Sequence, residues 1–334
     1  MFASELNSTP TNKTLGMMEQ HKIPYNMNRY RLSFLSIWAG LLLCSIMGGC
    51  QGKSAPKGDT ASAKVANQQS LNIDKKTRIV SLNGTLTEIL CALGYEKNIV
   101  GVDVTSTYPA SVRKLPKVGH NRNIQAEGVL SLQPTLVIGK KGEIKPELTQ
   151  QIKAAKIDLQ LFEMKATPEG TQQLIAQVAQ QLNKTKVGEE LNNKIKEQLG
   201  QVDKLEKAPK VLFIYARGTG TMMVAGDGTS VQQMITLAGG QNAISGFESF
   251  KPLTAEALIK ANPDVILMFD SGLKSLEGPE GLLKAPGVKE TNAGRNKAFI
   301  TMDGQFLNGF GPRLGEAALE LNKKLKESSS IAAK

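Results

Sequence analysis

An internal repeat is the feature of this 334-residue chain that most restricts its fold. Residues 124–138 and 253–267 align at a constant offset of 129 positions, with Ala, Glu and Pro coinciding and all but one of the large apolar positions matched. A weaker second pair, 86–94 and 231–239, ends on a glycine in both copies. Repeats this long are not solenoid units. They predict two similar lobes related by a pseudo-two-fold axis.

Each copy of the repeat lies in a region where short apolar runs alternate with amphipathic segments. The first region predicts strands at 79–82, 99–102, 136–138 and 159–162, with helices at 85–94, 125–132 and 146–156. The second predicts strands at 211–215, 265–268 and 298–300, with helices at 229–238, 254–261 and 315–326. Alternation of this kind is typical of α/β lobes built on parallel sheets.

The segment between the two copies is expected to be helical. Apolar residues recur at helical spacing from Pro168 to about Leu205, Thr167 stands at the N-cap position, and a break near residues 183–188 divides the segment into two helices. Ligands bind outside the carboxyl ends of parallel strands and between domains. The predicted fold is therefore α/β, with two similar lobes on mostly parallel sheets, a long helical connector and a ligand cleft between the lobes.

The first 71 residues have the composition of a processed leader. Arg29 and Arg31 precede an apolar run at 32–47, which predicts a secretory signal whose true start is either Met1 or Met27. The alternative, an uncleaved membrane anchor, requires about 20 apolar residues. The run ends in Met-Gly-Gly-Cys50, which resembles a bacterial lipobox and predicts lipidation of Cys50.

These boundaries divide the chain into five parts. They are a signal region at 1–49, a lipidated cysteine with a flexible tether at 50–71, an N-terminal lobe at 72–166, a connector at 167–208 and a C-terminal lobe at 209–334. The tether is too poor in large apolar residues to form a core. The chain is thus expected to be exported and held at the membrane by its lipid.

Charge and cysteine content narrow the function classes. The net charge is +11, of which residues 1–49 carry +2, so +9 remains from Cys50 onward. A basic surface suits an anionic ligand or an anionic membrane face. Nucleic acid is not expected as a partner, because export separates the chain from it and no aromatic-basic cluster is present. Cys91 is the one free cysteine left in the folded part, and its place in an apolar helical pattern predicts a buried small hydrophobe.

No motif of an enzyme stands out. The sequence contains no G-x-S-x-G elbow and no H-E-x-x-H helix, and residues 218–221 lack both the lysine of a phosphate loop and the third glycine of a dinucleotide loop. His120 is the single histidine of the exported chain, which argues against a zinc or manganese carrier. We therefore expect a binding protein.

Several motifs resemble periplasmic haemin-binding proteins of ABC importers, in the wider group that binds cobalamin and ferric siderophores. They are 107–109, 115–122, 126–132, 218–226, 250–253, 255–258 and 309–313, spread over Arg78 to Leu325. The resemblance implies that haem is captured in the inter-lobe cleft and delivered to a permease dimer with its ATPase. Cobalamin or a ferric siderophore is the alternative ligand, and a surface-anchored interaction protein is a more distant alternative.

The resemblance also implies ligand residues. The family typically has a tyrosine after Lys-Val-Gly, whereas this sequence has His120, and both residue types serve as axial ligands of haem iron. We expect His120 to bind the iron and Arg122 to pair with a propionate, a structural or incidental role for His120 being the alternative. Further candidates are Asn83, Tyr215, Arg217 and Met222, with packing as the alternative for Tyr215 and Met222 and a solvated surface position for Arg217.

Two glutamates occupy equivalent positions in the repeat. Glu127 and Glu256 are 129 residues apart, and in the wider family each lobe presents a carboxylate to basic residues of the permease. Two symmetry-related carboxylates can engage a symmetric dimer. Stabilisation of a helix N-terminus is the alternative role, and the two roles are compatible.

Overall fold

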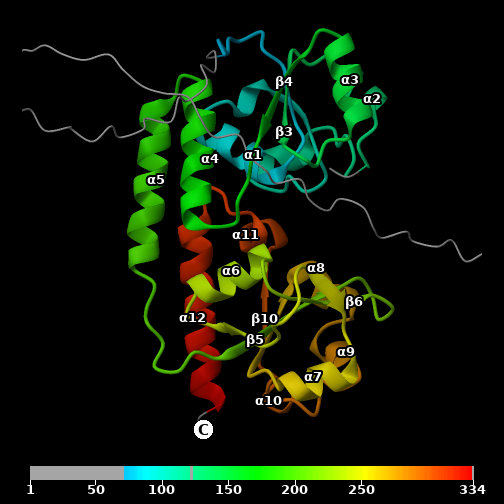
Figure 1. The fold of residues 1–334 in the computed structure, drawn as a ribbon, viewed down its shortest axis with the longest axis vertical. Helices are drawn as coiled ribbons and strands as arrows, with labels where there is room; N and C mark the ends of the chain where they lie inside the picture. Colours follow the sequence, from blue (N-terminus) through cyan, green and yellow to red (C-terminus); the bar gives the residue numbers. More distant parts are fainter. Residues whose placement is uncertain (1–70, 121–122, 333–334) are drawn as a thin grey trace, which may run out of the picture. The chain divides into compact units, whose positions relative to one another are not determined.

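The computed structural model describes residues 71–120 and 123–332, as drawn in Figure 1. The predicted signal, the lipidation site Cys50 and nearly all of the tether lie outside the described residues.

A four-stranded parallel sheet forms the centre of the N-terminal lobe. Its strands are β1 (Ile79–Ser81), β2 (Ile99–Val102), β3 (Leu136–Lys140) and β4 (Asp158–Phe162), in the order β2-β1-β3-β4. Helices α1 (Gly84–Ala92), α2 (Ala126–Leu130) and α3 (Pro146–Ala154) connect them, with short 3₁₀ turns at Glu96–Asn98 and Ala110–Lys114. β3 is buried from Leu136 to Gly139, as expected for a parallel strand that is covered on both faces.

The sheet of the C-terminal lobe is mixed. β5 (Lys210–Ala216), β9 (Val265–Phe269) and β10 (Phe299–Met302) are parallel, whereas β6 (Met222–Ala225) and β8 (Phe250–Pro252) extend the sheet in antiparallel fashion. The short β7 (Gln241–Asn242) pairs with the start of β5. The expectation of one loop over 217–223 was wrong at its end, because Met222 and Met223 already belong to β6.

The two lobes repeat each other in three dimensions. α2 and α7 (Ala255–Ala261) begin 129 residues apart, and so do β3 and β9. The pairing of β1 with β3 recurs in that of β5 with β9. α1 and α6 (Ser230–Leu237) are followed by Gly94 and Gly239, whose φ angles of +89° and +83° lie in the region that favours glycine. The internal repeat predicted from the sequence is therefore confirmed.

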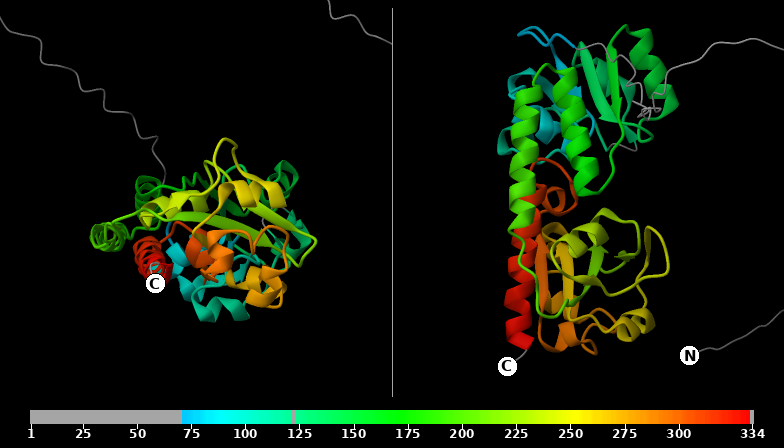
Figure 2. Two further views of the ribbon diagram at one scale, coloured as in Figure 1. Left: turned by 90° about the horizontal axis from the view of Figure 1, so that it is seen from below. Right: turned by 60° about the vertical axis from the view of Figure 1, so that its left-hand side comes forward.

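The connector consists of two helices, as predicted. α4 (Pro168–Gln181) begins after Thr167, whose side chain accepts a hydrogen bond from the Gly170 N–H at 3.0 Å. The chain reverses at Asn183, with φ of +55°, and α5 (Thr185–Gly200) runs back beside α4. The C-terminal α12 (Leu314–Ala332) packs against α5, as Figures 1 and 2 show.

Four short helices complete the C-terminal lobe. They are α8 (Asp270–Ser275), α9 (Pro279–Leu283), α10 (Asn292–Arg295) and α11 (Gly304–Asn308). None was predicted, because a helix of four to six residues is too short to show apolar periodicity.

One apolar core joins the lobes to the connector. It includes Leu86 of α1, Ile175 of α4, Phe213 of β5 and Leu321 of α12, and two further clusters fill the other faces of the sheets. Cys91 packs against this core but is only half-buried, so the prediction of a buried residue was wrong in degree. Burial raises the pKa of its thiol to about 12, so the thiolate that a nucleophile needs is scarce at neutral pH.

Candidate ligand-binding site

His120 lies at the carboxyl edge of the N-terminal sheet. Residues 116–119 run beside the end of β2, where the Val118 N–H donates to the Val102 carbonyl at 3.0 Å. The Val104 N–H donates to the Gly119 carbonyl, also at 3.0 Å. Gly119 has φ of +113°, which a side chain would strain, and it directs the chain into the exposed His120.

A buried carboxylate organises the turn that holds this loop. Asp103 is fully buried, and its oxygens accept hydrogen bonds from the Thr105 N–H at 3.0 Å, the Thr105 hydroxyl and the Ser106 hydroxyl at 2.6 Å. Lys117 Nζ donates to the Ser106 carbonyl at 3.0 Å. Burial lowers the pKa of Lys117, and the Asp103 charge partly offsets that shift. The backbone position of His120 therefore depends on a rigid 103–107 turn.

Tyr215 and Arg217 stand at the carboxyl end of β5 in the other lobe. The half-buried Tyr215 ring meets Phe269 edge-on, with centroids 6.3 Å apart. The exposed Arg217 guanidinium lies 5.7 Å from the Tyr215 ring centre, within the range of a cation–π contact. Met222 is half-buried and packs against an apolar cluster of this lobe. Its packing does not test a role in ligand binding.

The remaining predicted ligand residues differ in how far the structure describes them. Asn83 caps α1, because its Oδ1 accepts hydrogen bonds from the Thr85 and Leu86 N–H groups at 3.0 and 3.3 Å. Arg122 lies outside the described residues. The structure thus assigns Asn83 a capping function, and its role toward a ligand stays a prediction.

A polar junction joins the segment after β10 to the N-terminal lobe. Arg313, just before α12, forms a salt bridge with Glu88 of α1, including a 3.1 Å bond from its Nε to Glu88 Oε2. Its guanidinium carbon lies 3.7 Å from the Tyr108 ring centre and 4.7 Å from that of Phe306. Gln305 of α11 also reaches α1. These contacts bring the carboxyl ends of strands from both sheets together.

The sequence analysis missed this junction. Glu88 is 6% exposed, and burial raises the pKa of its carboxyl while the Arg313 guanidinium partly offsets the shift. An acidic residue inside the apolar pattern Leu86, Ile89 and Leu90 was a signal for a buried charge. Its partner is 225 residues away, beyond the reach of any local pattern.

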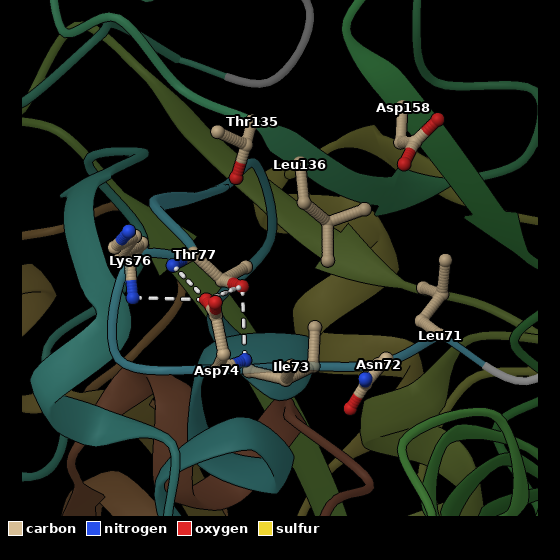
Figure 3. A pocket seen from close by; sticks show the side chains of 9 residues that line it. All are labelled: Leu71, Asn72, Ile73, Asp74, Lys76, Thr77, Thr135, Leu136 and Asp158. Carbon is tan, nitrogen blue, oxygen red and sulfur yellow. Dashed lines mark hydrogen bonds between the residues drawn. The ribbon is translucent and has the colours of Figure 1, made fainter.

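Two hollows are the best defined among the described residues, and neither is lined by His120 or Tyr215. The first, of about 350 Å³, lies at the amino ends of β3 and β4 and is shown in Figure 3, where Asp74 accepts hydrogen bonds from the Lys76 and Thr77 N–H groups at 2.9 Å. The second, of about 290 Å³, lies between α1, α5 and the start of α12. The first is at the sheet edge opposite to the one where ligands of parallel sheets bind.

Two surveys of the described part of the chain bear on membrane and metal chemistry. Among these residues, no helix combines the length and the apolar character that a membrane crossing needs. No three of their His, Cys, Asp or Glu side chains gather into a group that could hold a metal ion. A haem iron is carried by its porphyrin and needs only one or two protein ligands, so such a group is not a requirement for it.

Comparison with known families assigns the chain. A family model described as periplasmic binding protein matches residues 79–306, which include both sheets and the connector. The chain belongs to this family. Its members are substrate-binding transport proteins, so this periplasmic binding protein is not an enzyme.

Solved structures and a curated relative extend the likeness over most of the chain. The periplasmic heme-binding protein RhuT from Roseiflexus sp. RS-1, in apo form, is 42% identical, with a TM-score of 0.73 over 76% of this chain and 99% of its own. The heme-binding protein BhuT, in complex with two hemes, is 36% identical, with a TM-score of 0.71 over 75% and 98% of the two chains. YvrC of Bacillus subtilis (strain 168), named an uncharacterized ABC transporter substrate-binding lipoprotein, is 28% identical over 86% and 96% of the two chains.

Proposed function

We propose that this periplasmic binding protein captures haem between its lobes and delivers it to an ABC importer. The observation that carries the proposal is the likeness to RhuT and BhuT, both named as heme-binding, across nearly their whole lengths. The carboxyl edges of the two sheets supply residue types that suit a porphyrin with an iron centre and two carboxylates. Cobalamin or a ferric siderophore is the alternative ligand.

His120 is the proposed iron ligand on the N-terminal lobe. It is exposed at the carboxyl edge, and the Val104 to Gly119 hydrogen bond fixes the backbone immediately before it. A neutral imidazole is a common axial ligand of haem iron. The nearby Arg122 is proposed to pair with a propionate, because a guanidinium matches carboxylate geometry.

Tyr215 and Arg217 are the proposed contacts from the C-terminal lobe. They are two residues apart at the end of β5, and the guanidinium stays within 5.7 Å of the phenol ring centre. Arg217 offers a second cation for a propionate, while Tyr215 flanks the macrocycle and provides an oxygen of the type that binds haem iron in other proteins. Met222 is proposed to pack on the porphyrin.

Glu127 and Glu256 are proposed to dock onto the permease dimer. Both side chains are exposed, and each stands at the second position of its helix, α2 or α7. The equal spacing of these helices from β3 and β9 presents the carboxylates in equivalent ways on the two lobes. We further propose that the chain is exported and anchored by a lipid on Cys50, in line with the lipoprotein name of YvrC.

Haemin titration of the soluble form that lacks residues 1–50 tests the function. A Soret band that saturates with haemin is expected, and His120→Ala should weaken binding and shift the band. His120→Tyr restores the family's typical ligand type and should recover tight binding with a different spectrum. Asn123→Ala, three residues further along the same loop, is the matched control and should behave like the unmodified chain.

The outcomes separate the parts of the proposal. A band that survives His120→Ala unchanged excludes His120 as the ligand and makes Tyr215→Phe the next variant to measure. The absence of any band in the unmodified chain excludes haem, and the same titration with cyanocobalamin or a ferric hydroxamate then tests the alternative ligands.

A further inference from the structure

Gln305 uses every hydrogen-bonding position of its amide on the opposite lobe. Its Oε1 accepts hydrogen bonds from the Thr107 N–H at 2.7 Å and the Thr107 hydroxyl at 2.9 Å. Its Nε2 donates to the Gly84 carbonyl at 2.8 Å and to Glu88 Oε1 at 2.7 Å. A glutamine amide offers two donors and an acceptor with two lone pairs, so this side chain is fully satisfied.

The backbone around this amide is built for close approach. A Cβ on Gly84 would lie 2.8 Å from the Thr105 carbonyl oxygen and 3.1 Å from Gln305 Cδ, so a side chain at Gly84 would displace the amide. From the other side of the junction, a Cβ on Gly311 would lie 3.1 Å from Thr85 Cγ2. The Thr85 hydroxyl donates to the Gly309 carbonyl at 2.5 Å. Glycines on both sides of the junction therefore permit a contact that other residues would prevent.

Thr107 links this contact to the loop that bears His120. Thr107 ends the turn that the buried Asp103 carboxylate organises, and the Gly84 N–H donates to the Thr105 hydroxyl of that turn at 3.2 Å. The Val104 N–H of the same turn holds the Gly119 carbonyl, one residue before His120. A continuous series of hydrogen bonds thus runs from α11 of the C-terminal lobe to the backbone next to His120.

We propose that Gln305 is a positioning residue that fixes the orientation of the His120 loop relative to the C-terminal lobe. This rests on the proposed function, because His120 matters only if it binds the ligand. Separation of the lobes would break the bonds between Gln305 and Thr107, which removes support from the 103–107 turn. Opening of the lobes by a permease would then loosen the iron ligand at the same time as it widens the cleft.

Gln305→Glu is the most specific variant. It keeps the size of the side chain and the acceptor for Thr107, but a carboxylate cannot donate to the Gly84 carbonyl and it places a second negative charge beside Glu88. Thr107→Val removes one of the four hydrogen bonds and should have a smaller effect in the same direction. Gln150→Glu, on the exposed face of α3, is the matched control.

The test measures amide hydrogen exchange of the full-length chain in detergent and the rate of haem loss to an apoglobin acceptor. In Gln305→Glu, the peptide 103–120 should exchange about tenfold faster, which corresponds to the loss of one or two hydrogen bonds. The peptide 255–269, which covers α7 and β9, should be unchanged. Haem loss should accelerate by a similar factor, whereas Gln150→Glu should leave both measurements unaltered.

The outcomes decide the proposal separately from the function. Unchanged exchange at 103–120 overturns it, and so does faster exchange without faster haem loss. If Gln305→Glu unfolds globally, the Thr107→Val measurements decide in the same way. If the unmodified chain binds no haem, the proposed function fails, and exchange at 103–120 alone decides whether Gln305 orders this turn.

Discussion

At the scale of single residues, the ion pair between Glu88 and Arg313 is the most consequential contact. The side chains are 6% and 17% exposed, so water screens the pair only weakly. Tyr108 and Phe306 lie close to the guanidinium, and Gln305 donates a further hydrogen bond to the carboxylate. A buried pair of this kind adds little net stability, but the loss of one partner leaves an uncompensated charge.

Arg313→Gln is therefore expected to destabilise the protein in a pH-dependent way. Without the guanidinium, burial raises the pKa of Glu88 further above its unfolded value. The stability that goes with a raised carboxyl pKa is present below the unfolded pKa and is lost as pH rises through the folded pKa. The variant should lose about 3–5 kcal/mol at pH 8 and much less near pH 4, as measured by urea unfolding.

Lys297→Gln provides the comparison for this measurement. Its pair with Glu280 is exposed on both sides, so the variant should unfold like the unmodified chain at either pH. An equal loss for Arg313→Gln at pH 4 and pH 8 would show that packing against Tyr108 and Phe306, and not the charge on Glu88, determines the effect.

The sequence indicated residues whose signal is local and missed those whose signal is distant. Thr167 was recognised as an N-cap because the helix that follows it is visible in the adjacent residues. His120 was selected because it is the one histidine of the exported part, and its role stays a prediction. Gln305 and Arg313 showed no local signal, because their partners on α1 are more than 200 residues earlier in the chain.

At the scale of elements, the glycines after α1 and α6 are an equivalent pair with different surroundings. A Cβ on Gly94 would meet no atom within 4 Å, whereas one on Gly239 would lie 3.3 Å from Leu205 Cγ. Both residues have φ near +85°, a conformation that costs an L-residue about 1–2 kcal/mol. Substitution at Gly239 adds crowding to this backbone cost.

Alanine substitutions should therefore rank in a defined order. Gly94→Ala is expected to lower the free energy of unfolding by about 1 kcal/mol, and Gly239→Ala by more. Gly200→Ala should raise it by about 0.5–1 kcal/mol, because Gly200 lies within α5 and its Cβ would meet no atom within 4 Å. Urea unfolding of the three variants provides the test, and equal losses at positions 94 and 239 would contradict the role given to Leu205.

Elements with strong periodicity were predicted, and elements that depend on a distant partner were not. β2 matches its predicted range, and α4 and α5 divide close to the predicted break. β6 was missed, because Met222 follows a glycine-rich turn and its strand conformation depends on antiparallel pairing with Ala216. A short edge strand of this kind is defined by its neighbour more than by its own sequence.

At the scale of the whole molecule, the repeat presents two carboxylates in equivalent positions, and their docking role can be separated from helix stabilisation. Glu127 and Glu256 stand in the first turns of α2 and α7, as Glu147 and Glu280 do in α3 and α9. All four acids interact favourably with a helix N-terminus. Only the first two are proposed to contact the permease.

Double charge reversal tests this difference. Glu127→Lys with Glu256→Lys should abolish the stimulation of the importer's ATPase in proteoliposomes and leave haem affinity unchanged, since like charges then face the basic permease. Glu147→Lys with Glu280→Lys should leave the stimulation intact. Equal loss in both pairs would assign the effect to helix stability, and full stimulation in the first pair would exclude docking through these residues.

The junction between the lobes also has a consequence for the order in which the chain can fold. A ribosome releases residues from the N-terminus onward, so Glu88 emerges long before Arg313, which lies 225 residues later. Until then, α1 cannot bury its carboxylate against a counter-charge, and the N-terminal lobe lacks its last stabilising contact. A lobe that cannot finish folding before the chain is almost complete remains open to threading through a secretion channel, and the delay is encoded in the distance between two residues.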